Sequence, residues 1–168
     1  MEAGWTRRLD NLPAVWHPRG VGADLDHIVR SMEHCGSWEE RCRFLINLGR
    51  TLPALPPEDQ TEENRVQGCL SKVWVKARPG PERPPLLRLE ADSDAAIVKG
   101  LVAVLIAAYS GRSAPEILAF DIRGLLTRLD LQNQLSPSRS NGLFSMVERI
   151  HDLARSLEAT GPPPASPS

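Results

Sequence analysis

Cys69 is the residue whose type and position most directly suggest chemistry. It follows Gly68 and precedes a run from Leu70 to Ala77 that has the alternation of a β-strand. A loop cysteine at the mouth of a strand is held by a rigid element and stays within reach of a partner. Its thiolate can attack a carbonyl carbon, a phosphorus atom, a peroxide or another sulfur. The surrounding residues must decide among these reactions.

Several of these reactions lack their usual accessory residues near Cys69. Phosphatase loops use Cys-x5-Arg, but the residue six positions after Cys69 is Val75. Peroxide chemistry usually needs a resolving cysteine, whereas Cys35 and Cys42 are predicted to be small buried residues of their helices. A cysteine hydrolase needs a histidine base, but the histidines lie in the N-terminal arm or on helices without a local signature: His17, His27, His34 and His151. Sulfur-to-sulfur transfer needs only one accessible thiol and a protected place for the product.

Length, charge and cysteine usage set limits on the class of protein. The chain has 168 residues, of which 20 are basic and 21 acidic, so no overall field favours nucleic acid or a membrane surface. The longest apolar stretch, Leu101 to Tyr109, is much shorter than the roughly 20 residues of a membrane-spanning helix. The three cysteines form no CxxC pair, which fits a reducing compartment. These features predict a cytoplasmic protein that binds neither nucleic acid nor membranes.

The domain boundaries follow from composition. Residues 1–22 are rich in Pro, Gly, Arg and Trp without a clean period, and are predicted to form an arm. Residues 160–168 are rich in proline with little to bury, so we expect a disordered tail. One domain is therefore expected over residues 23–159.

Most of that domain has helical periodicity. The pattern predicts two N-terminal helices, the second opened by a capping box from Ser37 to Glu40. Asp94 is expected to cap a helix to about Ser110 that is apolar on nearly all sides. Short helices capped by Ser113 and Asp121 follow, and then an amphipathic helix with an apolar stripe: Leu143, Met146, Val147, Ile150, Leu153 and Leu157.

One β-hairpin interrupts these helices. Two alternating runs, at about 70–77 and 86–91, can pair about Pro81. This register places Val75 opposite Leu87 and Val73 opposite Leu89 on an apolar face. The other face then pairs Trp74 with Arg88 and Lys72 with Glu90. Since two strands alone are marginal, helices must cover the apolar face. The predicted fold class is α+β, a small antiparallel sheet with at least one hairpin packed against several α-helices.

Four segments of the chain also carry a specific resemblance. They are RFLINLG at 43–49, NRVQGCLSKVW at 64–74, ADSDAAIVKGL at 91–101 and SPSRSNGL at 136–143. In this order they resemble the SufE family of sulfur acceptors, over about Asp24 to Ala154. The family usually has Gln where this chain has Leu70. The resemblance implies a SufE/IscU-like fold.

The resemblance also implies a function. It identifies Cys69 as the thiol that accepts persulfide sulfur from a cysteine desulfurase, SufS-like or CsdA-like, and passes it to a downstream iron–sulfur scaffold such as SufBCD. The chain would activate the desulfurase as a sulfur-transfer partner rather than act as a stand-alone enzyme. It would hold no cofactor or metal of its own, because the pyridoxal phosphate belongs to the desulfurase. A monomer or weak dimer is expected.

The candidate supporting or partner-binding residues around Cys69 are Gly68, Ser71, Arg65 and Arg139. Gly68 permits backbone geometries that would let the loop hold Cys69 against apolar side chains and swing it outward. Arg65 and Arg139, with Lys72, are candidates to lower the thiol pKa or to meet an acidic partner. Two alternatives stay open: a direct iron–sulfur cluster scaffold, and a thiol hydrolase or peroxidase that uses Cys69.

Overall fold

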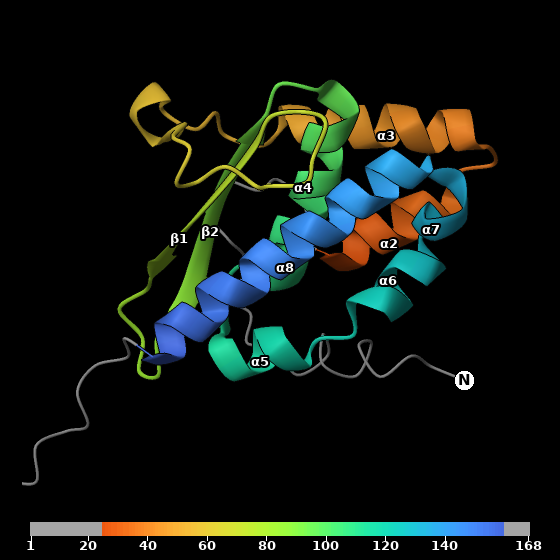
Figure 1. The fold of residues 1–168 in the computed structure, drawn as a ribbon. Helices are drawn as coiled ribbons and strands as arrows, with labels where there is room; N and C mark the ends of the chain where they lie inside the picture. Colours follow the sequence, from red (N-terminus) through yellow and green to blue (C-terminus); the bar gives the residue numbers. More distant parts are fainter. Residues whose placement is uncertain (1–24, 160–168) are drawn as a thin grey trace, which may run out of the picture.

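The most apolar segment of the chain forms the central helix. The computed structural model describes residues 25–159, so the predicted arm and tail lie outside the described residues. Helix α4 (Ala96–Tyr109) is buried at Val98 and at every residue from Gly100 to Tyr109. It packs against α2 (Leu25–His34), α3 (Trp38–Arg50) and α8 (Pro137–Ala159) (Figure 1). The expectation of a buried helix is confirmed.

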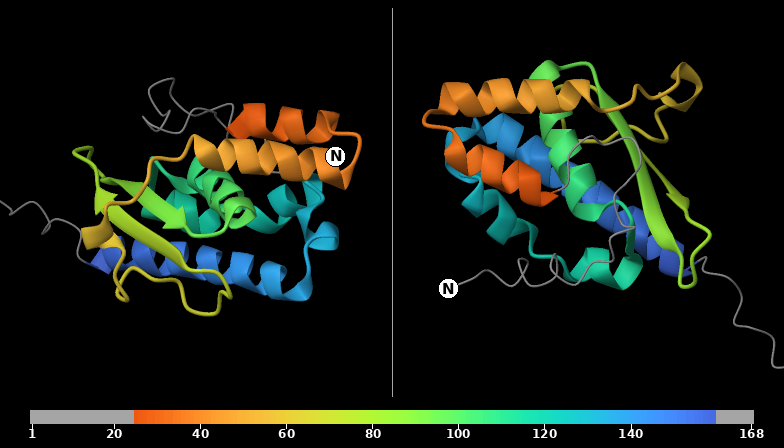
Figure 2. Two further views of the ribbon diagram at one scale, coloured as in Figure 1. Left: turned by 90° about the horizontal axis from the view of Figure 1, so that it is seen from above. Right: turned by 180° about the vertical axis from the view of Figure 1, so that it is seen from behind.

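A small antiparallel sheet covers another side of α4. Its strands are β1 (Val73–Pro79), β2 (Leu86–Ser93) and β3 (Arg112–Ser113), in the order β1-β2-β3. Strand β2 packs on α4 and β1 packs on α8. Seen from above, α4 lies between the pair α2 and α3 on one side and α8 on the other (Figure 2). The predicted α+β class, with a small antiparallel sheet against several helices, is confirmed.

The predicted hairpin register is wrong. Val75 pairs with Ala91 rather than Leu87, and Val73 pairs with Ser93 rather than Leu89. On the other face, Trp74 pairs with Asp92 rather than Arg88. The turn lies later than expected, because β1 continues to Pro79 and the Gly80 N–H donates to the Leu86 carbonyl across 2.7 Å. The shift is four residues, an even number, so the inward faces were still predicted correctly.

Side-chain caps mark the starts of helices α3, α5 (Ala114–Ala119) and α6 (Ile122–Arg128). Ser113 makes a complete capping box with Glu116 at the start of α5, and Asp121 caps α6. Both caps were predicted. Ser37 caps α3 by accepting from the Glu40 N–H, but the Glu40 carboxylate accepts from Gly36, so that capping box is incomplete. The short elements η2 (Pro57–Asp59) and α7 (Leu131–Gln134) complete the described fold.

Two cysteine placements differ from expectation. Cys35 and Cys42 are only partly buried and do not belong to the core. Cys35 lies just beyond the end of α2, where its thiol donates to the Ser31 carbonyl across 3.3 Å. The periodic pattern alone did not show that this helix ends at His34.

Among residues 25–159, no helix combines the length and the apolar character needed to cross a bilayer.

Helices α3 and α4 cross at two glycines. A Cβ at Gly49 would lie 2.8 Å from the Gly100 nitrogen, and a Cβ at Gly100 would overlap the Leu45 carbonyl. The two backbones therefore touch, and only glycine allows this distance. The crossing fixes the N-terminal half of α4, which lines the pocket described below.

We expect Gly100→Ala to lower the free energy of unfolding by about 1–3 kcal/mol, because the added methyl group forces the two helices apart. Urea denaturation measures the change. Gly36→Ala is the matched control, since its Cβ meets only the Glu40 carboxylate, at 3.5 Å. Equal stability of the two variants would contradict the close crossing.

Candidate functional site

The loop that carries Cys69 is closed at its base. The Val66 N–H donates to the Val73 carbonyl and the Val75 N–H donates to the Asn64 carbonyl, each across 2.8 Å. An isolated antiparallel bridge joins Arg65 to Trp74 between these bonds. Residues 67–72 therefore project as a tight loop from the start of β1.

The end of the loop is held by the turn between β2 and α4. The Asp94 carboxylate accepts from the Lys72 N–H across 3.0 Å, and the Ser93 hydroxyl donates to the Lys72 carbonyl across 2.9 Å. Asp94 was expected to cap α4, and this was wrong: the N-cap is Ala95, without a side-chain hydrogen bond. The Asp94 oxygen instead binds an N–H from a segment distant in sequence.

A buried carboxylate fixes that turn in place. Asp92 is buried, and its carboxylate accepts from the Leu55 N–H across 3.0 Å. It also accepts from the Ser93 N–H and pairs with the Lys99 ammonium at 3.2 Å. A buried charge needs such partners. Asp92 thereby joins the connector after α3, the end of β2 and the first turns of α4.

The tip of the loop rests on helix α8. The Cys69 thiol donates to the Gly142 carbonyl across 3.4 Å, and a Cβ at Gly142 would itself lie 3.4 Å from the sulfur. Gly68 has a φ of +89°, and a Cβ there would lie 2.7 Å from the Ser145 hydroxyl oxygen. A Cβ at Gly142 would make only an ordinary van der Waals contact with the sulfur, whereas Gly68 provides a backbone conformation that other residues disfavour.

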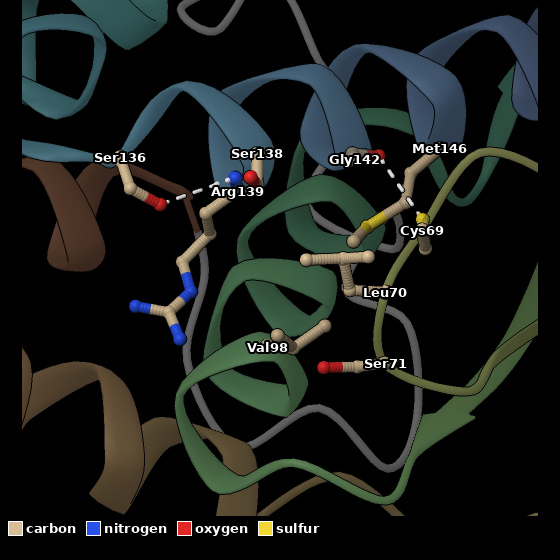
Figure 3. Close-up of a pocket in the computed structure, with 9 residues that line it drawn as sticks. All are labelled: Cys69, Leu70, Ser71, Val98, Ser136, Ser138, Arg139, Gly142 and Met146. Atoms are coloured by element: carbon tan, nitrogen blue, oxygen red, sulfur yellow. Dashed lines mark hydrogen bonds between the residues drawn. The ribbon is translucent and has the colours of Figure 1, made fainter.

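Cys69 lines a small pocket of about 80 Å³ between its loop, α4 and the start of α8. Val98 and Met146 form a buried apolar part of its wall (Figure 3). Ser136 accepts from the Arg139 N–H across 3.3 Å at the start of α8. The complete lining is Cys69, Leu70, Ser71, Val98, Ser136, Ser138, Arg139, Gly142 and Met146.

Burial favours the protonated form of the Cys69 thiol. The side chain is partly buried against the core, and this burial raises its pKa. Burial is the cause of this shift. Burial likewise raises the pKa of Cys42, where the Arg139 guanidinium acts in the opposite direction. The expected lowering of the Cys69 pKa by Arg65, Lys72 or Arg139 is therefore not found in this conformation.

The structure brings some predicted residues together and separates others. Ser71 and Arg139 line the pocket with Cys69, and Gly68 shapes the loop beside it. Arg65 pairs with Glu62 at 3.1 Å and lines a different groove along α8. Lys72 contributes backbone hydrogen bonds with Asp94 and Ser93 that hold the loop. The roles of these residues in sulfur transfer stay predictions.

The three described histidines lie outside this pocket. His151 contacts the Tyr109 hydroxyl at 3.4 Å instead, and His17 lies outside the described residues. Within residues 25–159, no three His, Cys, Asp or Glu side chains gather where they could share a metal ion.

Sequence reasoning missed part of the site. Met146 was assigned only to the apolar stripe of the last helix and Val98 only to a buried helix, and Gly142 was named only as part of the SPSRSNGL segment. The available signal was that Val98 and Gly142 both lie in segments that resemble the SufE family. Nothing local could show that a thiol from another segment would lie beside them.

Comparison with known proteins gives consistent results. A family model described as "SufE: Fe-S metabolism associated domain" matches residues 26–154. An "Uncharacterized SufE-like protein" of Rhizobium etli is 46% identical over 134 residues, covering 79% of this chain and 90% of the relative. One of Rhizobium meliloti is 44% identical over 127 residues, covering 75% and 91%. The solution structure of a hypothetical protein from Thermus thermophilus matches with a TM-score of 0.65 at 22% identity, covering 81% of this chain and 96% of that one, which shows the same fold.

The raised pKa predicts how Cys69 ionises with pH. In a Cys35→Ala/Cys42→Ala chain, we expect thiolate absorbance to appear at higher pH when folded than in urea, where the pKa is about 8.5. The folded state then binds more protons than the unfolded state, so raising the pH through this interval lowers the free energy of unfolding. A midpoint below the unfolded value would contradict the partly buried position of the thiol.

Asp94→Ala should loosen the Cys69 loop. It removes the acceptor of the Lys72 N–H, a bond worth about 0.5–1.5 kcal/mol. We expect iodoacetamide to alkylate Cys69 several-fold faster, as read by peptide mass spectrometry, with a small change in stability. Asp152→Ala, an exposed aspartate of α8 paired with Arg155, is the control. Unchanged alkylation in Asp94→Ala would show that this bond does not restrain the loop.

Proposed function

The chain belongs to the SufE family, whose domain is associated with iron–sulfur metabolism, and from that premise we propose that Cys69 carries persulfide sulfur. A cysteine desulfurase would supply the sulfur, and iron–sulfur cluster assembly would consume it. The observation that carries the proposal is the placement of Cys69 on a loop clamped at its base and seated in a partly open apolar pocket.

The transfer step is an exchange at sulfur. The Cys69 thiolate attacks the terminal sulfur of the donor's cysteine persulfide, and the donor cysteine leaves as a thiolate. One S–S bond breaks and one forms, so no external oxidant or reductant is required. The product is a persulfide on Cys69, and the donor returns to its thiol form.

The resting geometry supports protection rather than reactivity. A protonated thiol is a poor nucleophile, and Cys69 rests with its pKa raised by burial. Attack therefore requires the loop to move the sulfur away from the Gly142 carbonyl, which would return the thiol pKa toward its ordinary value. The same pocket, lined by Val98 and Met146, would shield the persulfide from small thiols and oxidants afterwards.

Activation of the desulfurase follows from the same step. Removal of the persulfide frees the donor cysteine for another turnover, so the acceptor accelerates the donor enzyme. Arg139 supports docking, because it is exposed at the rim of the pocket. It would suit an acidic group near the donor cysteine.

Neither alternative function gains support from the described residues. A direct cluster scaffold would use several cysteine ligands, whereas Cys69 is the one cysteine among the described residues that line the pocket. A hydrolase would use a histidine base, and the pocket residues include none. Iron binding and peroxide consumption by the purified protein would test these alternatives directly.

We expect the protein, mixed with a cysteine desulfurase and free cysteine, to gain the mass of one sulfur atom that dithiothreitol removes. Cys69→Ser should abolish both this adduct and the stimulation of the desulfurase. Intact-mass and peptide mass spectrometry locate the added sulfur.

Cys35→Ala and Cys42→Ala are the matched controls, and both should still accept sulfur. The absence of an adduct on Cys69 would overturn the proposal. Loss of transfer in a folded Cys42→Ala variant would show that the sulfur passes through a second thiol.

A further inference from the structure

Leu70 is an exception to the burial of apolar side chains in this chain. Among the large hydrophobic residues of the described segment, it alone is exposed, with 87% of its surface accessible. Burial of a leucine side chain shifts an equilibrium constant by about tenfold or more. An exposed leucine therefore contributes favourable binding free energy when a partner buries it.

The position of Leu70 links it to the reacting sulfur. It directly follows Cys69, and consecutive Cα atoms are about 3.8 Å apart. Both side chains line the same pocket, Cys69 turned toward α8 and Leu70 beside Met146 and Val98 (Figure 3). A donor whose outer persulfide sulfur forms an S–S bond of about 2.05 Å with Cys69 must place its surface against Leu70.

The residues around Leu70 resemble an interface centre. Polar side chains from its own loop and from the start of α8 line the same pocket: Ser71, Ser136, Ser138 and Arg139. The residues that dominate binding at interfaces are surrounded by near-neutral contacts that exclude water, and these polar side chains lie where such a ring would be. A surface leucine without a role in binding would not be expected to lie directly beside the candidate thiol.

We propose that Leu70 is the apolar anchor of the donor interface, inserting into an apolar depression beside the persulfide-bearing cysteine of the desulfurase. This inference rests on the proposed sulfur-carrier function and adds the residue that selects the donor. Insertion of Leu70 holds the loop against the donor while Cys69 leaves α8. The anchor contributes to binding, and the exchange itself is performed by Cys69.

Leu70→Gln tests the anchor, because it replaces the apolar end of the side chain with a polar amide and keeps a side chain of similar size. The measurement is desulfurase turnover against the concentration of this protein. We expect the concentration for half-maximal stimulation to rise about tenfold, and Leu70→Met to restore it. Glutathione persulfide is a donor without a protein surface. The loss of its sulfur transfer rate in Leu70→Gln should be about one tenth of the loss measured with the desulfurase.

Leu157→Gln is a control with the same change at a leucine that packs partly on the core, so urea denaturation must first show that it folds. It lies 15 residues beyond Gly142 on α8, about 22 Å along the helix, and should leave stimulation unchanged.

Three results would overturn the inference. Unchanged half-maximal stimulation in Leu70→Gln would show that the donor does not bind Leu70. Equal losses with both donors would show that Leu70 acts on the thiol within its own chain, for example by entering the pocket. Loss of self-association, with unchanged stimulation, would assign Leu70 to a contact between copies of the chain. If the wild-type protein accepts sulfur from neither donor, the carrier function itself fails, a result separate from these three.

Discussion

The clamped loop of residues 67–72 is the constraint on which the site depends. Three contacts define it: the Val66 to Val73 bond at its base, the Asp94 carboxylate on Lys72, and the Cys69 thiol on the Gly142 carbonyl. They come from three separate parts of the fold, namely β1, the turn between β2 and α4, and α8. Most of the described architecture serves to bring these parts to one place. The Gly49 and Gly100 crossing and the buried Asp92 are the strongest examples.

The clamp creates a balance between protection and reactivity. Burial raises the Cys69 pKa and lowers its nucleophilicity, whereas the proposed sulfur transfer needs an ionised and accessible sulfur. A permanently exposed thiol would react without a partner, and a fully buried one would not react at all. The loop resolves this conflict because its restraints are few and sit at its ends and tip. Moving the tip breaks one weak sulfur hydrogen bond and leaves the base of the loop intact.

The sequence predicted the parts of the protein that depend on neighbouring residues. Helix α4 is buried because its segment is apolar on nearly all sides, and the Ser113 and Asp121 caps follow from side chains within three residues of the bonds they make. Gly68 was singled out for its conformational freedom and has a positive φ. The inward faces of the hairpin were correct, but its register was not. Alternation fixes which side chains point inward and leaves the pairing to the turn.

Contacts between distant segments required the tertiary structure. Cys69 and Gly142 are 73 residues apart, and Lys72 and Asp94 are 22 apart. Local propensity made Asp94 a reasonable helix cap, yet its carboxylate binds the loop backbone because that N–H lies closer in the folded chain. The same holds for Arg65 and Arg139, of which only Arg139 reaches the Cys69 pocket. The sequence by itself predicted the buried helix and the family, and it singled out Cys69 as the candidate thiol. The fold alone decided what surrounds the thiol, because hydrogen bonds and burial depend on distance in space rather than along the chain.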